Sequence, residues 1–205
     1  MRPVLTLMAY NLYRDDIGKA LKSAIGIEIF HNYTLLHDDV MDDAELRRGR
    51  LTVHKKWNSN VAILSGDAAA ITAYKYIENC EDKYLRQVID GFNQGAMDVC
   101  KGQQYDMEFE SRNDVTEEEY IHMIYLKTSV LIAGSLRHGA LIAGAPAHEY
   151  NALYDFGGYL GLVFQLQDDF LDVYGDVAEF GKKIGGDILE NKKTYLLIKA
   201  LEQAG

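Results

Sequence analysis

The stretch LLHDDVMDD at positions 35–43 decides how the rest of the sequence is interpreted. Asp38 and Asp42 are four residues apart, so on a helix their side chains share one face, with Cβ atoms about 5–6 Å apart. Asp39 points about 100° away from that face. Towards the N-terminus the same face continues as a mostly apolar stripe of Leu35, His31 and Ile27. Carboxylates that continue an apolar stripe are predicted to lie at the mouth of a core.

The stretch FQLQDDFLD at 164–172 repeats this pattern with Asp168, Asp169 and Asp172. Its face continues back through Gln165, Gly161 and Gly157. Four to six carboxylates brought together repel one another unless cations lie among them. Carboxylate, water and phosphate oxygens are the ligands that Mg²⁺ accepts. One such cluster could equally be a solvated acidic helix end, but two copies beside basic residues predict a magnesium site.

Basic residues follow both acidic clusters. Arg47 and Arg48 come directly after the first cluster, and Lys127 lies beside Thr128 in an apolar segment. The second cluster is followed by GKKIGGDILENKKT, which contains Lys182, Lys183, Lys192 and Lys193. Arginine suits bidentate contact with phosphate, and lysine supplies a point charge. The pattern predicts a metal-bound polyanion as substrate; a solvated ion-pair surface is the alternative, and applies best to Lys183 and Lys193.

Composition limits the class of protein. The chain has 205 residues and a formal net charge of −10, with 48% hydrophobic and 25% charged residues, which is ordinary for a soluble globular domain. We expect one domain over residues 1–205 and no nucleic-acid partner, because a nucleic-acid binder shows a basic face. The sequence lacks an apolar run of about 18 residues, a signal peptide and a disulfide framework, so we expect no membrane span and a cytoplasmic location.

Apolar residues recur at helical spacing almost throughout, and no segment alternates convincingly with period two. Helices are predicted after Asp15–Asp16, over about 62–78, from Leu85 to Asp106, from Thr116 to Gly144, over about 148–174, and from near Lys192. Thr116 with Glu119 forms a capping box, and Gly144 with Pro146 ends that helix. The predicted fold is all-α, a bundle of long, mostly antiparallel helices around a central cavity.

These segments together resemble the trans-isoprenyl diphosphate synthases, the polyprenyl synthase family. The matching segments cover essentially the whole chain in the family's order; they are RPVL, HNYTLLHDDVMDDAELRRGR, LSGDA, GQQYD, LKTSVL, FQLQDDFLDVYGD and GKKIGGDILENKKT. The resemblance implies a homodimer with a deep central substrate cavity and two facing aspartate motifs. It also implies Mg²⁺-assisted, head-to-tail condensation of an allylic diphosphate with isopentenyl diphosphate.

The resemblance also implies a role for each matching residue. The metal ligands would be Asp38, Asp42 and Asp168, assisted by Asp39, Asp169 and Asp172. The allylic diphosphate would be held by Arg47, Lys127 and Lys182, with Lys192 near its metal-bound part. Isopentenyl diphosphate would be held by Arg2, His31 and Arg48. Gln165 and Asp106 would support the metal and lysine network, and Thr128 and Gln103 would lie near the allylic carbon.

For two of these residues a purely structural role is the alternative to a functional one, because buried polar groups need hydrogen-bond partners whatever their function. His31 could be a satisfied buried histidine, and Gln103 could serve a structural hydrogen bond. Phe30 and Tyr33 precede Asp38 by about 12 and 7.5 Å along a helix. An aromatic residue five positions before the first motif resembles the short-chain pattern, so we expect a C15–C20 product with Tyr33 as the cavity floor, although the helical wheel alone does not favour Tyr33.

The match is incomplete at both ends. The family has Gly-Gly-Lys before the pair that corresponds to Arg2–Pro3, and it continues beyond the position of Gly205. We therefore expect a chain truncated at both ends, with weakened binding of isopentenyl diphosphate. Three other interpretations stay open: a class I terpene cyclase-like enzyme, a non-catalytic partner subunit of a prenyl synthase, and a plain helical scaffold.

Overall fold

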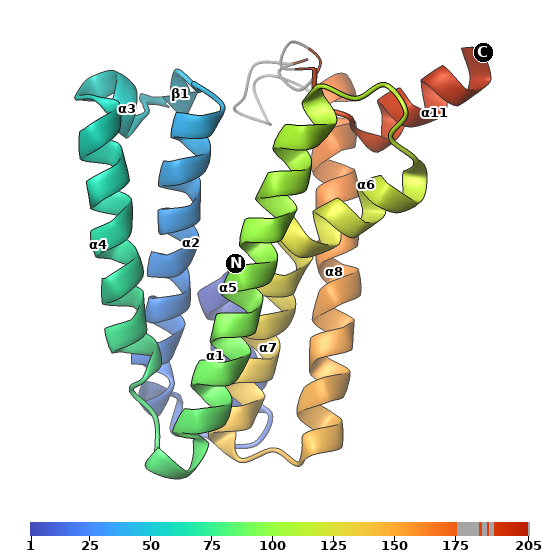
Figure 1. Cartoon of the computed structure of the whole chain (residues 1–205). Coiled ribbons are helices and arrows are strands. Elements are labelled where there is room, and N and C mark those ends of the chain that lie inside the picture. The colour runs from blue at the N-terminus through green and yellow to red at the C-terminus, as the bar shows by residue number, and fades with distance from the viewer. Residues whose placement is uncertain (176–184, 186–187, 189–190, 205) are drawn as a thin grey trace.

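The computed structural model describes residues 1–175, 185, 188 and 191–204, and over these residues the fold is the predicted all-α bundle (Figure 1). The elements are α1 (Arg2–Asn11), η1 (Ile17–Lys19), α2 (Leu21–Met41), β1 (Leu46–Arg47), β2 (Arg50–Leu51), α3 (Val53–Lys56), α4 (Ser59–Ile77), α5 (Asp82–Glu110), α6 (Glu117–Ile124), η2 (Tyr125–Ser129), α7 (Val130–Ala143), α8 (Ala147–Tyr174) and α11 (Tyr195–Ala204).

The long helices are mostly antiparallel, as predicted. Figure 1 shows α2, α5 and α8 running in one direction, with α4 and α7 running in the other. The C-terminal ends of α2, α5 and α8 therefore lie at the same end of the bundle, which also carries α3, the β1–β2 hairpin and α11. We call this end the acidic end, because both aspartate motifs lie there. Helix C-termini carry partial negative charge, so the dipoles of these helices add to the charge of the aspartates.

Local sequence sets the helix ends. Asn58 caps α4 by accepting a hydrogen bond from the Val61 N–H at 2.9 Å. The predicted capping box is present, since Thr116 and Glu119 each accept a hydrogen bond from the other's backbone N–H. Gly144 ends α7 with a φ of 89°, a left-handed conformation that glycine adopts without strain. The helix predicted to begin near Lys192 begins at Tyr195 instead.

Several features were not predicted, the short helix α3 among them. The helix α1 was missed, because it has only ten residues and no side-chain cap at its N-terminus. The β1–β2 hairpin has two residues in each strand, too few to show an alternating pattern. The segment from Thr116 to Gly144 is not one α-helix, because the π-helical segment η2 separates α6 from α7.

The core forms around α7, most of whose side chains are buried. This helix packs against α1, α5 and α8. Its contact with α8 depends on glycine, since a Cβ on Gly157 would lie 2.6 Å from Ala133 Cα. The described part of the chain contains no helix with the length and apolar character needed to cross a bilayer. Cys80 and Cys100 are free.

Candidate active site

The hairpin that follows α2 returns an arginine onto the first aspartate motif. Its two-residue turn, Arg48–Gly49, has φ values of 52° and 71°, the backbone that a tight hairpin turn requires. Arg47 then donates from Nε to Asp39 Oδ1 at 2.7 Å and from Nη2 to Asp38 Oδ2 at 3.3 Å. Charge-assisted hydrogen bonds of this kind are among the strongest hydrogen bonds in proteins. The guanidinium therefore compensates two carboxylates of the motif.

Lys127 joins the first motif to α5. Its Nζ lies 3.1 Å from Asp38 Oδ1 and 2.7 Å from Asp106 Oδ2. This approach depends on Gly102, because a Cβ there would lie 2.6 Å from Lys127 Cα. Burial alone would lower the pKa of Lys127, but the two carboxylates outweigh it and raise the pKa. Lys127 is therefore a permanently charged group between two helices.

A second ammonium group lies among three carboxylates. Lys192 Nζ is 2.7 Å from Glu110 Oε1, 3.0 Å from Asp106 Oδ2 and 3.1 Å from Asp42 Oδ1. Oxygens of these three acidic residues lie within 4.8 Å of one another, close enough to share a cation. Glu110 was not identified from the sequence, although it follows Asp106 by four residues and so shares its helix face.

Burial raises the pKa values of the carboxylates in this site, whereas the nearby cations lower them. Burial raises the pKa of Asp42, and the negative charge of Asp38 adds to this effect. Burial also raises the pKa of Asp39, despite its bond to Arg47. For Asp106, the ammonium groups of Lys127 and Lys192 outweigh burial and lower the pKa. Asp106 is therefore the securely ionised carboxylate at this position.

Asp169 of the second aspartate motif takes part in a chain of buried hydrogen bonds. Asp169 is buried and accepts hydrogen bonds from the Tyr120 hydroxyl and from Gln165 Nε2, the latter at 2.9 Å. Gln165 Oε1 accepts a hydrogen bond from Thr128 Oγ1 at 2.9 Å. Burial raises the pKa of Asp169 in spite of both donors. Tyr120 was not identified from the sequence, because it lies 49 residues from Asp169 with no local pattern linking them.

The π-helical segment η2 connects the two halves of the site. Lys127 contacts Asp38 and Asp106, whereas the adjacent Thr128 bonds to Gln165 on α8. Asp172 is buried and Asp168 half-buried, one turn apart at the end of α8. π-Helical turns are rare and occur often at functional sites. Here the turn directs two neighbouring side chains to different helices.

A group of basic residues lies beside the first motif. Burial, followed by the positive charge of Arg2 and Arg48, lowers the pKa of His31 to about 3. Burial also lowers the pKa of Arg2 to about 10, although the negative charge of Glu28 opposes this change. The buried Arg2 Nε has no hydrogen-bond partner within the described part of the chain. A site with cationic groups and an unmatched buried donor is suited to an anion.

The remaining predicted residues lie close to these groups or outside the described residues. Gln103 is half-buried on α5, next to Gly102, and its Nε2 is buried without a partner among the described residues. Phe30 is buried and Tyr33 is half-buried, and their ring centroids are 5.3 Å apart. Lys182 lies outside the described residues.

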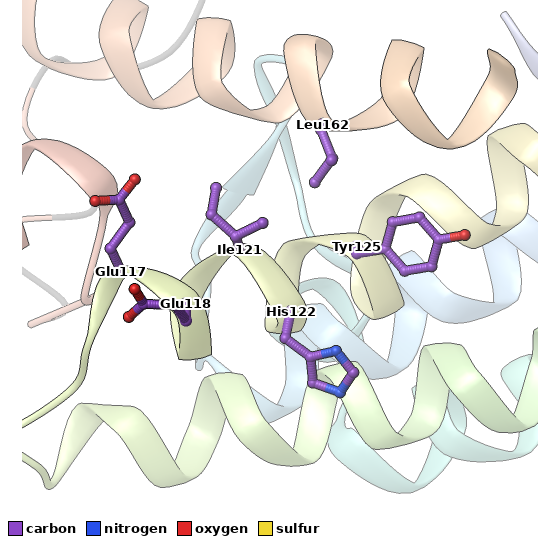
Figure 2. A pocket seen from close by; sticks show the side chains of 6 residues that line it. All are labelled: Glu117, Glu118, Ile121, His122, Tyr125 and Leu162. Atoms are coloured by element: carbon purple, nitrogen blue, oxygen red, sulfur yellow. The ribbon is translucent and has the colours of Figure 1, made fainter. Parts of the chain in front are cut away.

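A separate groove between α6 and α8 has a volume of about 430 Å³. Figure 2 shows Ile121 and Leu162 facing each other across it, with Tyr125 towards one end and two glutamates at the other. Glu117 and Glu118 make this groove unsuitable for a diphosphate, because like charges repel. The predicted substrate residues Arg47, Lys127 and Lys192 lie elsewhere, in contact with the carboxylates of the acidic end.

Comparison with known proteins agrees with this geometry. The family model described as polyprenyl synthetase matches residues 1–205. The short chain isoprenyl diphosphate synthase of Methanothermobacter thermautotrophicus is 42% identical over 205 residues, covering 100% of this chain and 63% of that protein. The chain therefore spans less than two thirds of the length of this curated relative.

Solved structures give the same result. A crystal structure of a geranylgeranyl pyrophosphate synthase has a TM-score of 0.95 at 52% identity, covering 99% of this chain and 62% of that one. A geranyltransferase from Helicobacter pylori, complexed with magnesium and isoprenyl diphosphate, has a TM-score of 0.85 at 30% identity, covering 99% and 70%. Taken with the two aspartate motifs and the lysines between them, these matches show that the chain belongs to the polyprenyl synthetase family.

Proposed function

We propose that this protein condenses an allylic diphosphate with isopentenyl diphosphate, head to tail, to give a C15–C20 prenyl diphosphate, and that it uses Mg²⁺. The observation that carries the proposal is the alternation of charge at the acidic end. Lys127 bridges Asp38 and Asp106, and Lys192 bridges Asp106 and Asp42. Such an arrangement can hold a metal and a polyanion together, because each of its charges has a partner of the opposite sign nearby.

The residues present fit a hard divalent cation. Carboxylate oxygens are the ligands that Mg²⁺ prefers, and the converging helix C-termini favour a cation further. We propose that Asp38, Asp42 and Asp168 ligate Mg²⁺, assisted by Asp172. The bonds of Asp39 to Arg47 and of Asp169 to Tyr120 and Gln165 support an assisting role for these two aspartates. Bound Mg²⁺ would stabilise negative charge on the departing diphosphate.

The cationic side chains would bind the two diphosphates separately. Arg47, Lys127 and Lys192 would hold the allylic diphosphate, together with Lys182. Arg2 and Arg48 would hold isopentenyl diphosphate, and a neutral His31 would donate one hydrogen bond to it. Preorganised donors aimed at the leaving group stabilise the charge that develops there as the carbon–oxygen bond breaks.

Polar groups near the allylic carbon would position it without attacking it. Thr128, held by Gln165, and Gln103 are proposed to lie beside the carbocation. The apolar core below excludes water that would quench it. The double bond of isopentenyl diphosphate then attacks the cation, and the released diphosphate takes up the proton that is lost. Tyr33 and Phe30 would end the cavity and limit the product length.

We also propose a cytoplasmic homodimer whose single domain covers residues 1–205. The described residues of α4 include the exposed apolar side chains Ile63, Leu64 and Ile71, with exposed fractions of 40%, 68% and 63%. Large exposed apolar patches mark protein interfaces. Sedimentation velocity tests the proposal, since Leu64→Glu should convert a dimer into a monomer; a monomeric parent protein would contradict it.

The activity is tested by incubating the chain with isopentenyl diphosphate, Mg²⁺ and C5, C10 or C15 allylic diphosphates, and measuring product length. Asp38→Asn and Lys127→Met should each reduce turnover at least about 100-fold. Lys199→Met is the matched control, because Lys199 pairs with Glu117 and Glu202 away from the site. Full activity in both site variants would refute the assignment. Hydrocarbon release without isopentenyl diphosphate would indicate a cyclase instead.

A further inference from the structure

A row of aromatic rings extends from the first aspartate motif along α2 to α5 and ends at the exposed Tyr74 of α4. The ring centroids are 4.8 Å apart for His37–Tyr33, 5.3 Å for Tyr33–Phe30, 4.9 Å for Phe30–Phe92 and 5.0 Å for Phe92–Tyr74. All four contacts are tilted or edge-to-face, the arrangements that aromatic pairs favour. We call these five residues the aromatic row. It begins at His37, the residue directly before Asp38.

His37 is held in place by one face of α4. Its Nε2 lies 3.1 Å from the Ile63 carbonyl oxygen, so Nε2 carries the proton and donates it. The same nitrogen is 3.7 Å from Asp67 Oδ1. Between these two residues lies Gly66, where a Cβ would be 2.5 Å from His37 Cδ2. Glycine at this position is therefore what allows the imidazole to lie against α4.

Tyr33 is flanked by one fixed ring on each side. Phe30 is only 4% exposed and packs edge-on against Phe92 of α5, so it has little freedom to move. His37 supplies the contact on the other side of Tyr33. Tyr33 itself is half-buried, and its ring is less enclosed than that of Phe30. Removing the His37 ring would free the Tyr33 ring to swing towards α4.

Space for a longer apolar tail lies beyond the aromatic row. Phe92 also lines a cavity of about 70 Å³ between α5 and α7, whose other lining residues include Ile27, Val88, Val130 and Leu131. Polar side chains, Arg137 and His138 among them, line the same cavity, so a tail that passes Phe30 and Phe92 would meet apolar side chains beside polar ones.

We propose that His37, lying against Gly66, is a positioning residue that fixes the Tyr33 ring and thereby sets the longest prenyl tail that the protein accepts. This inference rests on the proposed function, because it concerns the tail of that substrate. His37 acts through Tyr33 and touches neither diphosphate. Gly66 and Asp67 belong to the LSGDA segment, which the proposed chemistry does not otherwise use.

The test measures binding rather than turnover. The dissociation constants of C10, C15, C20 and C25 prenyl diphosphates are measured with Mg²⁺, and the length at which affinity stops rising is recorded. His37→Gln keeps a donor but loses the ring, and should move this limit one isoprene unit longer, with the first excluded homologue gaining about tenfold in affinity. His37→Phe keeps the ring and should keep the limit of the parent protein.

A second variant changes the α4 residue against which His37 lies. Gly66→Ala pushes the imidazole towards Tyr33 and should move the limit to a shorter tail. Gly26→Ala is the matched control on the same helix pair, because its Cβ would lie 2.7 Å from Ile77 Cγ1 and away from His37. This control should lower the melting temperature without moving the limit. Circular dichroism checks that each variant is folded.

The outcomes separate the two proposals. An unchanged limit in folded His37→Gln or Gly66→Ala protein overturns the role of His37 and leaves the proposed function intact. Failure of the parent protein to bind any prenyl diphosphate refutes the proposed function, and the inference with it. A shift in the limit for Gly26→Ala would show that loosening of the α2–α4 contact, and not His37, controls the length.

Discussion

Replacing Lys192 by methionine is expected to destabilise the ligand-free protein and to increase the stabilisation that Mg²⁺ provides. The Lys192 ammonium lies within 3.1 Å of carboxylate oxygens on Asp42, Asp106 and Glu110, and its side chain is 11% exposed. The three acidic groups lie within 4.8 Å of one another. At this separation and an effective dielectric constant of about 20, each ionised pair repels by about 3 kcal/mol. The cluster therefore requires a cation or a proton.

The expected loss in the free energy of unfolding is about 2 kcal/mol at neutral pH, below the range for breaking a fully buried ion pair. The value is reduced because Lys127 still pairs with Asp106 and because solvent screens part of the repulsion. Bound Mg²⁺ would relieve the repulsion between these carboxylates. A ligand present at about 100 times its dissociation constant adds about 2.7 kcal/mol to the free energy of unfolding. The variant should therefore recover most of its loss when Mg²⁺ is added.

Urea unfolding followed by circular dichroism measures both effects, with and without Mg²⁺. Lys199→Met serves as control, because Lys199 pairs with glutamates of α6 and α11 and not with the cluster. The control should respond to Mg²⁺ as the parent protein does. A Lys192→Met protein as stable as the parent, or one that gains no more from Mg²⁺, would refute the reasoning about this cluster.

Three further outcomes follow from described contacts. Burial lowers the pKa of His138 to about 4, so this residue should contribute a loss of at most about 3 kcal/mol in stability as pH drops from about 6.5 to 4, in addition to the loss that buried His31 causes over the same range; His138→Leu should reduce the slope in urea titrations, and equal slopes would contradict it. Gly161→Ala should cost about 2 kcal/mol, because the new Cβ would lie 2.6 Å from Ser129 Cβ, whereas Gly95→Ala meets no atom within 4 Å and should not destabilise the protein thermally. Arg47→Lys should weaken calorimetric binding of inorganic pyrophosphate with Mg²⁺ about tenfold, through loss of bidentate contact, and unchanged affinity would place the anion elsewhere.

The parts of the site that lie on regular helices could be predicted from the sequence. Spacing of four residues places Asp38 with Asp42, and Asp168 with Asp172, because the α-helical period fixes which residues share a face. The capping box at Thr116 was predicted for the same reason, since both of its bonds are local. Local geometry therefore gave the long helices and the ends that carry the carboxylates.

The partners of those carboxylates could not be predicted in this way, because they depend on contacts between distant segments. Arg47 reaches Asp39 only through a hairpin whose turn has positive φ at Arg48 and Gly49. Tyr120 meets Asp169 across 49 residues, and Lys192 meets Glu110 across 82. No periodicity in the sequence encodes such distances, so these bonds follow only from the tertiary structure.

The π turn at Tyr125–Ser129 also has a consequence for redesign of this protein. Winding the same residues as ordinary α-helix would rotate everything after the turn by about 100° relative to what precedes it. Either the Lys127 amine would lose its salt bridges to the carboxylates of α2 and α5, or the Thr128 hydroxyl would lose its hydrogen bond to Gln165. A homologous structure with an uninterrupted α-helix at this position would therefore align one residue out of register. Straightening this segment would break the link that it makes between the first and the second aspartate motif.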